Sequence, residues 1–134
     1  MSWSYACPWC GAMLNPDKTI ILTASRGGKR ILIGFHPEPG NYQLFLPPGV
    51  AIEEGDHWDF FCPVCRENLV TGELEELCEL RMMRDSEEHQ VFFSRIAGEQ
   101  ATIVVAKGQS EPTVKEKHGD LAEQYAAQIM PMRF

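Results

Sequence analysis

The sequence predicts a mainly β protein, in which an antiparallel sheet domain is built around a four-cysteine metal site and followed by a short C-terminal helix. Three observations carry this prediction: a Gly-Gly corner between two apolar segments, two Cys-x-x-Cys pairs, and helix-spaced apolar residues near the end of the chain. A chain of 134 residues with a 44% hydrophobic fraction is long enough to form one domain that buries about two-thirds of its unfolded surface.

The segment TIILTASRGGKRILIGF, residues 19–35, predicts a β-hairpin. Gly27 and Gly28 suit a two-residue turn whose central positions have positive φ, and they pair Arg26 with Lys29. This register places three apolar pairs on one face: Ala24–Ile31, Leu22–Ile33 and Ile20–Phe35. The other face is mixed, as expected for a half-buried antiparallel ribbon.

Further strands are expected after the hairpin, at residues 42–46, 57–61, 77–84, 90–96 and 101–106. The strand at 57–61 runs directly into the second cysteine pair. Residues 74–84 also have a helical alternative, because Leu74, Leu77 and Leu80 recur at helix spacing. We favour the strand.

The expected domain organisation is a β domain over residues 1–106, a polar linker over 107–118, and a C-terminal helix and tail over 119–134. Asp120 is placed as the helix cap and Pro131 as its end. Leu121, Tyr125 and Ile129 share one face of this helix. Because so short a helix is not stable alone, it is expected to dock on the same domain.

The two cysteine pairs have the same outline, Cys7-Pro8-Trp9-Cys10-Gly11 and Cys62-Pro63-Val64-Cys65-Arg66. Two residues between the cysteines let one tight turn direct both sulfurs at one ion, and proline presets φ in that turn. Glycine after the second cysteine permits positive φ. Two such turns supply four soft thiolates in a tetrahedron, which suits zinc or a single iron ion.

These pairs resemble the knuckles of zinc ribbons, with the rubredoxin-like knuckle pair as a close cousin. The resemblance covers residues 5–11 and 61–69, and it implies that the ligands are Cys7, Cys10, Cys62 and Cys65. The sequence departs from the family at Arg66, where the usual glycine is missing, and in the long insert between the pairs. Zn²⁺ is the expected ion, and Fe in an electron-transfer protein is the alternative.

A closed four-sulfur site has no position open to water, so the site is expected to be structural. The function predicted is a non-catalytic zinc-binding domain that serves protein–protein interaction or regulation. The alternatives are a rubredoxin-like iron protein and an accessory zinc ribbon of nucleic-acid machinery. No catalytic constellation stands out, so we expect no enzyme and no catalytic residue.

The cysteines and histidines also have interpretations other than the metal site. Four free thiols, or two local disulfides, are the alternatives for the paired cysteines. Cys78 lies on alternate positions with Leu80 and Met82 and is expected to be a small buried hydrophobe. His57 could replace one cysteine as a ligand, but a strand residue is the better interpretation.

The formal charge of −7 argues against nucleic acid as a partner, because an acidic body repels phosphate. Arg26, Lys29 and Arg30 make one basic hairpin tip, which is too small to reverse that expectation. No apolar run is long enough for a membrane span, and the start of the chain has no secretory pattern. We therefore expect a cytoplasmic protein with an unidentified protein partner; exposed sheet edges would also allow a homodimer.

Overall fold

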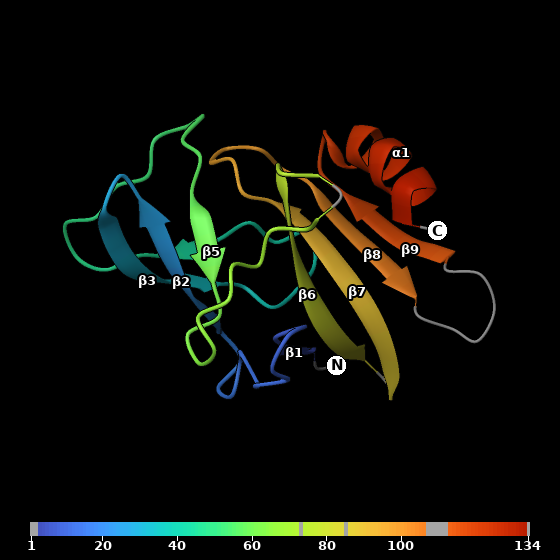
Figure 1. The fold of residues 1–134 in the computed structure, drawn as a ribbon, viewed down its shortest axis with the longest axis horizontal. Helices are drawn as coiled ribbons and strands as arrows, with labels where there is room; N and C mark the ends of the chain where they lie inside the picture. The colour runs from blue at the N-terminus through green and yellow to red at the C-terminus, as the bar shows by residue number, and fades with distance from the viewer. Residues whose placement is uncertain (1–2, 73, 85, 107–112, 134) are drawn as a thin grey trace.

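Two antiparallel sheets lie side by side, and a single helix covers the outer end of the larger one (Figure 1). The computed structural model describes residues 3–72, 74–84, 86–106 and 113–133. Its elements in chain order are β1 (Ser4–Ala6), β2 (Ile20–Arg26), β3 (Lys29–Phe35), β4 (Leu44–Phe45), β5 (Asp59–Phe61), β6 (Leu77–Arg84), β7 (Glu87–Ser94), β8 (Thr102–Ala106), β9 (Thr113–His118) and α1 (Ala122–Arg133). The mainly β prediction is confirmed.

The smaller sheet has the order β4-β3-β2-β5 and is built on the predicted hairpin. Arg26 pairs with Lys29, and every predicted pair along the ribbon is present in the predicted register. Gly27 and Gly28 have φ angles of 57° and 83°, so the turn uses the left-handed conformation that glycine tolerates. Ala24 and Leu22 are buried on the inner face.

The larger sheet has the order β1-β6-β7-β8-β9, and its strands β7 and β8 are buried on both faces. Leu80, Val91 and Val104 face the smaller sheet, within the core between the sheets. Phe92 and Ile103 belong to a second core, which lies beneath α1. Burial on both faces explains why β7 and β8 carry continuous apolar runs and do not alternate.

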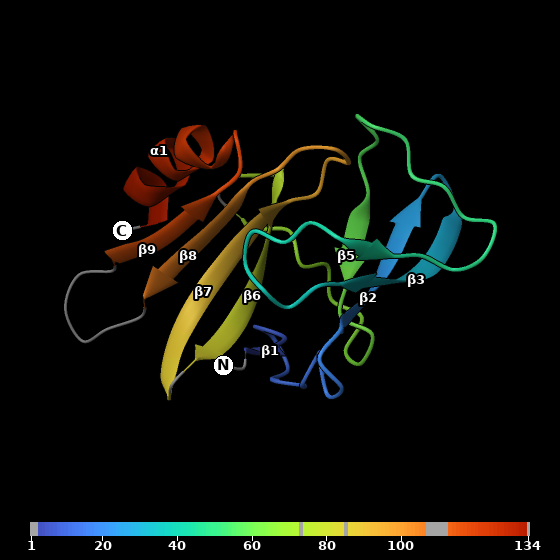
Figure 2. The same ribbon diagram turned by 180° about the vertical axis from the view of Figure 1, so that it is seen from behind.

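The helix α1 packs on the larger sheet (Figure 2). Tyr125 and Ile129 are buried in the second core, and Leu121 packs against it. The helix begins at Ala122 and continues to Arg133, so the prediction that Pro131 ends it is wrong. Proline lacks an N–H and forfeits one backbone hydrogen bond, which a helix near its end tolerates. No described helix combines the length and the apolar character that crossing a bilayer requires.

Several strand boundaries differ from those predicted. The strand expected at 42–46 is only the two residues of β4, and the strand expected at 57–61 begins at Asp59. β7 extends from Glu87 to Ser94 because the hairpin before it turns more tightly than expected, with Ser86 at a φ of 66°. β6 covers the predicted residues 77–84, and the helical alternative there is wrong.

Two strands were not predicted at all. β1 has three residues, too few for a periodic pattern. Residues 113–118, expected to belong to a linker, form the edge strand β9, while 107–112 lie outside the described residues. The division of the chain into a domain, a linker and a tail stays a prediction.

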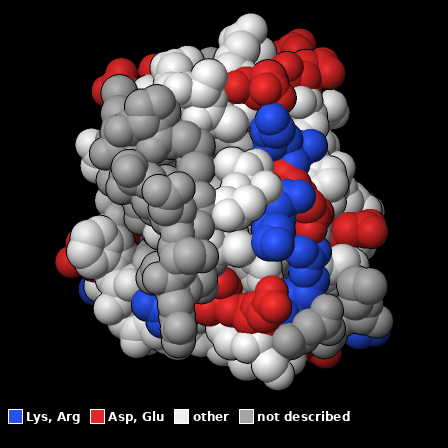
Figure 3. Space-filling model, turned by 90° about the vertical axis from the view of Figure 1, so that its right-hand side faces the viewer, with Lys and Arg blue, Asp and Glu red and all other residues white. Residues whose placement is uncertain are grey.

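Charged side chains are exposed on the side of the molecule that β9 and α1 occupy in Figure 1. Figure 3 shows a row of Lys and Arg side chains there, with Asp and Glu side chains beside it. Lys117 lies 2.7 Å from Glu123, and Arg84 lies 2.6 Å from Glu116. Lys117 on β9 and Arg84 at the end of β6 are therefore both paired with carboxylates.

Candidate metal centre

The two cysteine pairs form turns with matching backbone geometry. In the first knuckle (residues 7–13), the N–H of Cys7 donates to the carbonyl of Ala12 at 3.0 Å, and the N–H of Gly11 donates to the carbonyl of Cys7 at 3.0 Å. In the second knuckle (residues 62–68), the equivalent bonds join Cys62 to Glu67 at 3.1 Å and Arg66 to Cys62 at 2.9 Å. The two segments thus fold as two copies of one turn.

Each knuckle begins at the end of a strand from a different sheet. Cys7 follows β1 of the larger sheet, and Cys62 follows β5 of the smaller one. The two turns meet at the lower edge of the molecule in Figures 1 and 2. The four-cysteine cluster therefore lies where the two sheets approach each other.

The sulfur atoms of Cys7, Cys10, Cys62 and Cys65 all lie within 4.8 Å of one another. The Sγ atoms of Cys7 and Cys65 are 3.7 Å apart, as are those of Cys10 and Cys62. A disulfide requires about 2.05 Å, so none of these contacts is a disulfide. The structure therefore brings together the four predicted residues as a possible metal site, and all four are free cysteines, so the alternative of two local disulfides is wrong.

Backbone amides point at the sulfurs of both knuckles. The N–H groups of Trp9 and Cys10 donate to Sγ of Cys7 at 3.3 and 3.5 Å. The N–H groups of Val64 and Cys65 donate to Sγ of Cys62, both at 3.4 Å. Such donors stabilise negative charge on sulfur, so the turns favour thiolates at the two cysteines that are most buried.

The thiols differ in their affinity for protons. Burial raises the pKa of the Cys7 thiol to about 12, although amide donors work against it. Burial also raises the pKa of the Cys62 thiol. Hydrogen bonds from the N–H groups of Cys65 and Val64 and from the neighbouring thiols outweigh burial, and they lower this pKa to about 7. The two knuckles thus shift the pKa values of their buried thiols in opposite directions, and a cation that binds four thiolates must displace the protons that the thiols carry.

The aromatic residues near the pairs divide into core and surface residues. Tyr5, Trp58 and Phe60 are buried in the core between the sheets. Trp9 instead exposes 66% of its surface, and Val64, at the same position of the second knuckle, also exposes 66%. Trp9 thus does not belong to the core, because its position at the turn tip directs it outward.

Arg66 has a φ of 68°, and Gly11 at the equivalent position of the first knuckle has a φ of 76°. Left-handed backbone costs a residue with a Cβ about 1–2 kcal/mol in the folded state. Glycine avoids this cost but loses more conformational entropy on folding, so the net gain in stability from glycine is smaller. We expect Arg66→Gly to raise the free energy of unfolding by about 0.5–1 kcal/mol, and Gly11→Ala to lower it by about 1 kcal/mol. Urea titrations of the metal-loaded variants measure both free energies of unfolding. A change of the same sign in the two variants would contradict the view that positions 11 and 66 both favour glycine.

Cys78 lies outside the cluster and is fully buried in the core between the sheets, as predicted. Burial raises the pKa of its thiol to about 12, so almost none of it is thiolate at neutral pH. We expect iodoacetamide at pH 8 to leave Cys78 unmodified in the folded protein and to modify it after unfolding in urea, as followed by peptide mass spectrometry. Rapid labelling of Cys78 in the folded state would show that β6 opens readily.

The histidines do not join the cluster of described residues. The group of close ligand atoms does not include His57, whose backbone forms an isolated bridge with Ile96. His118 contacts Glu116 at 2.8 Å on β9, and His89 is buried beside Glu87 on β7. Among the described residues, the four cysteines are the one group of His, Cys, Asp and Glu side chains that could hold a metal ion.

Comparisons with family models, with curated proteins and with solved structures find no match for this chain. The resemblance to zinc ribbons therefore rests on the two knuckles alone.

Proposed function

We propose that the four cysteines bind one zinc ion, which fastens the two sheets together. The observation that carries this proposal is the sulfur cluster, formed by turns distant in the chain. With Zn–S bonds of about 2.3 Å, an ideal tetrahedron has sulfur–sulfur edges of about 3.8 Å. The separations of 3.7 Å between Cys7 and Cys65 and between Cys10 and Cys62 fit that edge.

The role of the ion is structural in this proposal. Cys7 and Cys62 continue β1 and β5, so one ion bonded to both knuckles ties the larger sheet to the smaller. Four thiolates fill the tetrahedron and leave no position for water or substrate. The chain's own residues supply the ligands, and their amide donors hold the sulfurs in place.

Elemental analysis of the purified protein tests the proposal. We expect one zinc per chain, and a marked loss of bound zinc when any one of the four cysteines is replaced by serine. Cys78→Ala is the matched control, because it also removes a buried thiol but should keep the full zinc content. A red protein with one iron per chain would favour electron transfer, and a metal-free wild-type protein would contradict both functions.

We also propose that the domain is a non-catalytic binding module that works in the reducing cytoplasm. Its two knuckle tips, Trp9 and Val64, present apolar side chains to solvent at equivalent positions next to the cluster. Aromatic residues are enriched at protein interfaces, whereas the charge of −7 disfavours nucleic acid. A protein partner therefore suits this face best.

Site-specific photo-crosslinking tests the binding role. A photoreactive residue at position 9 and one at position 64 should each give the same adduct, and one at Glu123, on the helix at the outer end of the larger sheet, should not. The partner so identified should then bind the purified Trp9→Ala variant at least tenfold more weakly than the wild type. Undiminished binding by the variant would rule out the knuckle tips as the interface.

A further inference from the structure

A hollow on the molecular surface lies where the second knuckle leaves β5 of the smaller sheet. Its wall combines residues of the hairpin, of β5 and of the knuckle. They are Thr23, Arg30, Phe61, Cys62, Pro63 and Arg66. Both arginines are exposed, so the hollow is open to solvent.

The hollow adjoins apolar surface on the outer face of the smaller sheet. Thr23 pairs with Leu32 on one side and with Phe61 on the other, and cross-strand partners lie on the same face. Leu32 exposes 58% of its surface. A row of side chains across β3, β2 and β5 therefore offers apolar contacts next to the two cations.

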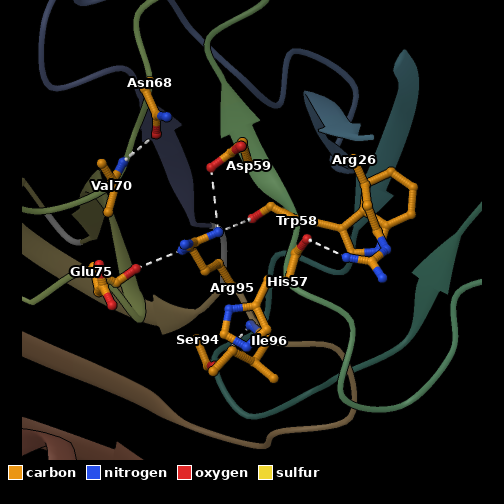
Figure 4. Close-up of polar contacts among 10 residues, drawn as sticks. All are labelled: Arg26, His57, Trp58, Asp59, Asn68, Val70, Glu75, Ser94, Arg95 and Ile96. Carbon is orange, nitrogen blue, oxygen red and sulfur yellow. Dashed lines mark hydrogen bonds and ion pairs between the residues drawn. The ribbon is translucent and has the colours of Figure 1, made fainter. Parts of the chain in front are cut away.

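Arg30 and Arg66 differ from the other arginines whose side chains the structure describes. Figure 4 shows two of the others, Arg26 and Arg95, each of which donates to a backbone carbonyl. Among the described residues, no carboxylate pairs with Arg30 or Arg66, and no acceptor bonds to either guanidinium. Each of the other arginines is paired with a carboxylate: Arg26–Asp56, Arg81–Glu88, Arg84–Glu116 and Arg95–Asp59.

The guanidinium of Arg30 is placed by an aromatic ring. Its Cζ lies 5.6 Å from the ring centroid of Phe61, which is a cation–π contact. This contact engages no hydrogen-bond acceptor, so the N–H groups of the guanidinium can still bind an anion. The cation is thus held at the hollow with its donors unused.

Arg66 occupies a backbone position that favours glycine. Its φ is 68°, and Gly11 at the equivalent position of the first knuckle has a φ of 76°. The side chain of Arg66 is exposed and adds nothing to the core. Costly backbone conformations of this kind concentrate at binding sites, so an arginine here supports a role for its guanidinium.

The two cations donate no hydrogen bond to the cysteine cluster. In the described part of the chain, the N–H donors to the sulfurs are backbone amides, those of Trp9, Cys10, Ala12, Val64 and Cys65. Cys62 lines the hollow, so four thiolates around one zinc ion would place negative charge close to any ligand there. Together with the charge of −7 on the whole chain, this favours an anion with a single charge.

We infer that this hollow binds the carboxylate of one acidic side chain in an otherwise apolar segment of a protein partner. Guanidinium groups match a carboxylate with paired N–H donors, and Leu32 and Phe61 offer contacts to the flanking apolar side chains. A small-molecule site encloses most of its ligand, which a hollow this open does not. The inference rests on the proposed binding role and names the chemistry of the partner beside the Val64 tip.

Three peptides test the inference on the metal-loaded protein. The first is acetyl-Ser-Leu-Glu-Leu-Ser-amide, the second has glutamine in place of glutamate, and the third has phosphoserine there. The Nε–H signals of the arginines in a ¹⁵N–¹H correlation spectrum are assigned from Arg→Gln variants. We expect the glutamate peptide to bind saturably, to shift the Arg30 and Arg66 signals, and to bind about tenfold more tightly than the glutamine peptide. It should also bind more tightly than the phosphoserine peptide.

Matched variants separate the two guanidinium groups from general charge. Arg30→Gln and Arg66→Gln should each make the glutamate and glutamine peptides bind almost equally. Lys29→Gln removes a positive charge from the same hairpin but lies outside the hollow, so it should preserve the preference for glutamate. Arg66→Gly should be more stable than the wild type and yet lose the preference, which a purely structural role of Arg66 would not produce. Zinc content checks the fold of each variant.

Three results would overturn the inference: no shift of the Arg30 and Arg66 signals, tighter binding of the phosphoserine peptide, or an equal loss of preference in Lys29→Gln and Arg66→Gln. The partner identified by crosslinking separates this failure from that of the proposed function. If Trp9→Ala weakens that partner and Arg66→Gln does not, the knuckle tips are the interface and the inference about the hollow is wrong. If Arg66→Gln weakens it and Trp9→Ala does not, the hollow is supported and the tips are ruled out.

Discussion

Removal of the metal with a strong chelator is expected to lower the midpoint of thermal unfolding by roughly 10–20 °C. Zinc bound by cysteines in small domains is worth about 10–16 kcal/mol of apparent binding free energy, and a fall of 10–20 °C in a chain of this size means that about 3–6 kcal/mol of it appears as folding free energy. In this protein the loss falls on the contact between the two sheets, because Cys7 and Cys62 continue strands of different sheets. Circular dichroism melts with and without chelator measure the change.

Two controls distinguish this loss from a general effect of the chelator. Added zinc should restore the original midpoint, and Cys78→Ala, which leaves the cluster intact, should respond to the chelator as the wild type does. The Cys7→Ser variant should have a low thermal midpoint even without chelator, and the chelator should change that midpoint little. A wild-type midpoint that does not move on complete removal of the metal would show that the cluster does not hold the sheets together.

Gly119→Ala is expected to lower the free energy of unfolding by about 2–5 kcal/mol. Gly119 has a φ of 94° in the corner between β9 and α1, where left-handed backbone disfavours a side chain. A Cβ there would also overlap the backbone carbonyl of Gln100, which accepts the N–H of Leu121 at 3.2 Å. The corner must shift to admit a methyl group, and the shift disturbs the start of the helix. Urea unfolding measures the loss.

Gly28→Ala is the matched control for this prediction. Gly28 also has positive φ, at 83°, but a Cβ there would meet no atom within 4 Å. We therefore expect a loss of only about 1–2 kcal/mol, from the backbone conformation alone. Equal losses at positions 28 and 119 would mean that the packing against Gln100 contributes nothing.

The sequence predicts well those parts of the fold in which neighbouring residues allow only one backbone conformation. Gly27 and Gly28 impose a two-residue turn, and that turn fixes the register of the ribbon on either side. The Cys-Pro-x-Cys spacing likewise imposes a turn that gathers two sulfurs. The meeting of the two pairs required the long-range fold, yet it was predicted because one metal ion needs all four ligands.

Other parts depend on tertiary contacts that local patterns do not reveal. β9 alternates exposed and partly buried residues at the edge of a sheet, so its sequence resembles a polar linker. It becomes a strand because β8 offers it an unpaired edge. The exposure of Trp9 also follows from tertiary structure, since an aromatic residue beside a cysteine pair suits a core equally well.

The hollow beside the second knuckle was invisible to sequence analysis for a similar reason. Its wall combines Thr23, Arg30 and Arg66, which come from separate segments and carry no shared motif. By pattern, Arg30 is one charge of a basic hairpin tip and Arg66 is a departure from the knuckle's usual glycine. Only the folded structure brings the two arginines to one hollow.

X-ray absorption spectroscopy at the metal edge of the purified protein is the most direct test of the central claim. The account predicts zinc with four sulfur neighbours at about 2.3 Å and no nitrogen or oxygen ligand. A first shell that contains a histidine nitrogen or a water oxygen would contradict it. So would a sulfur count that falls no lower in Cys62→Ser than in the wild type.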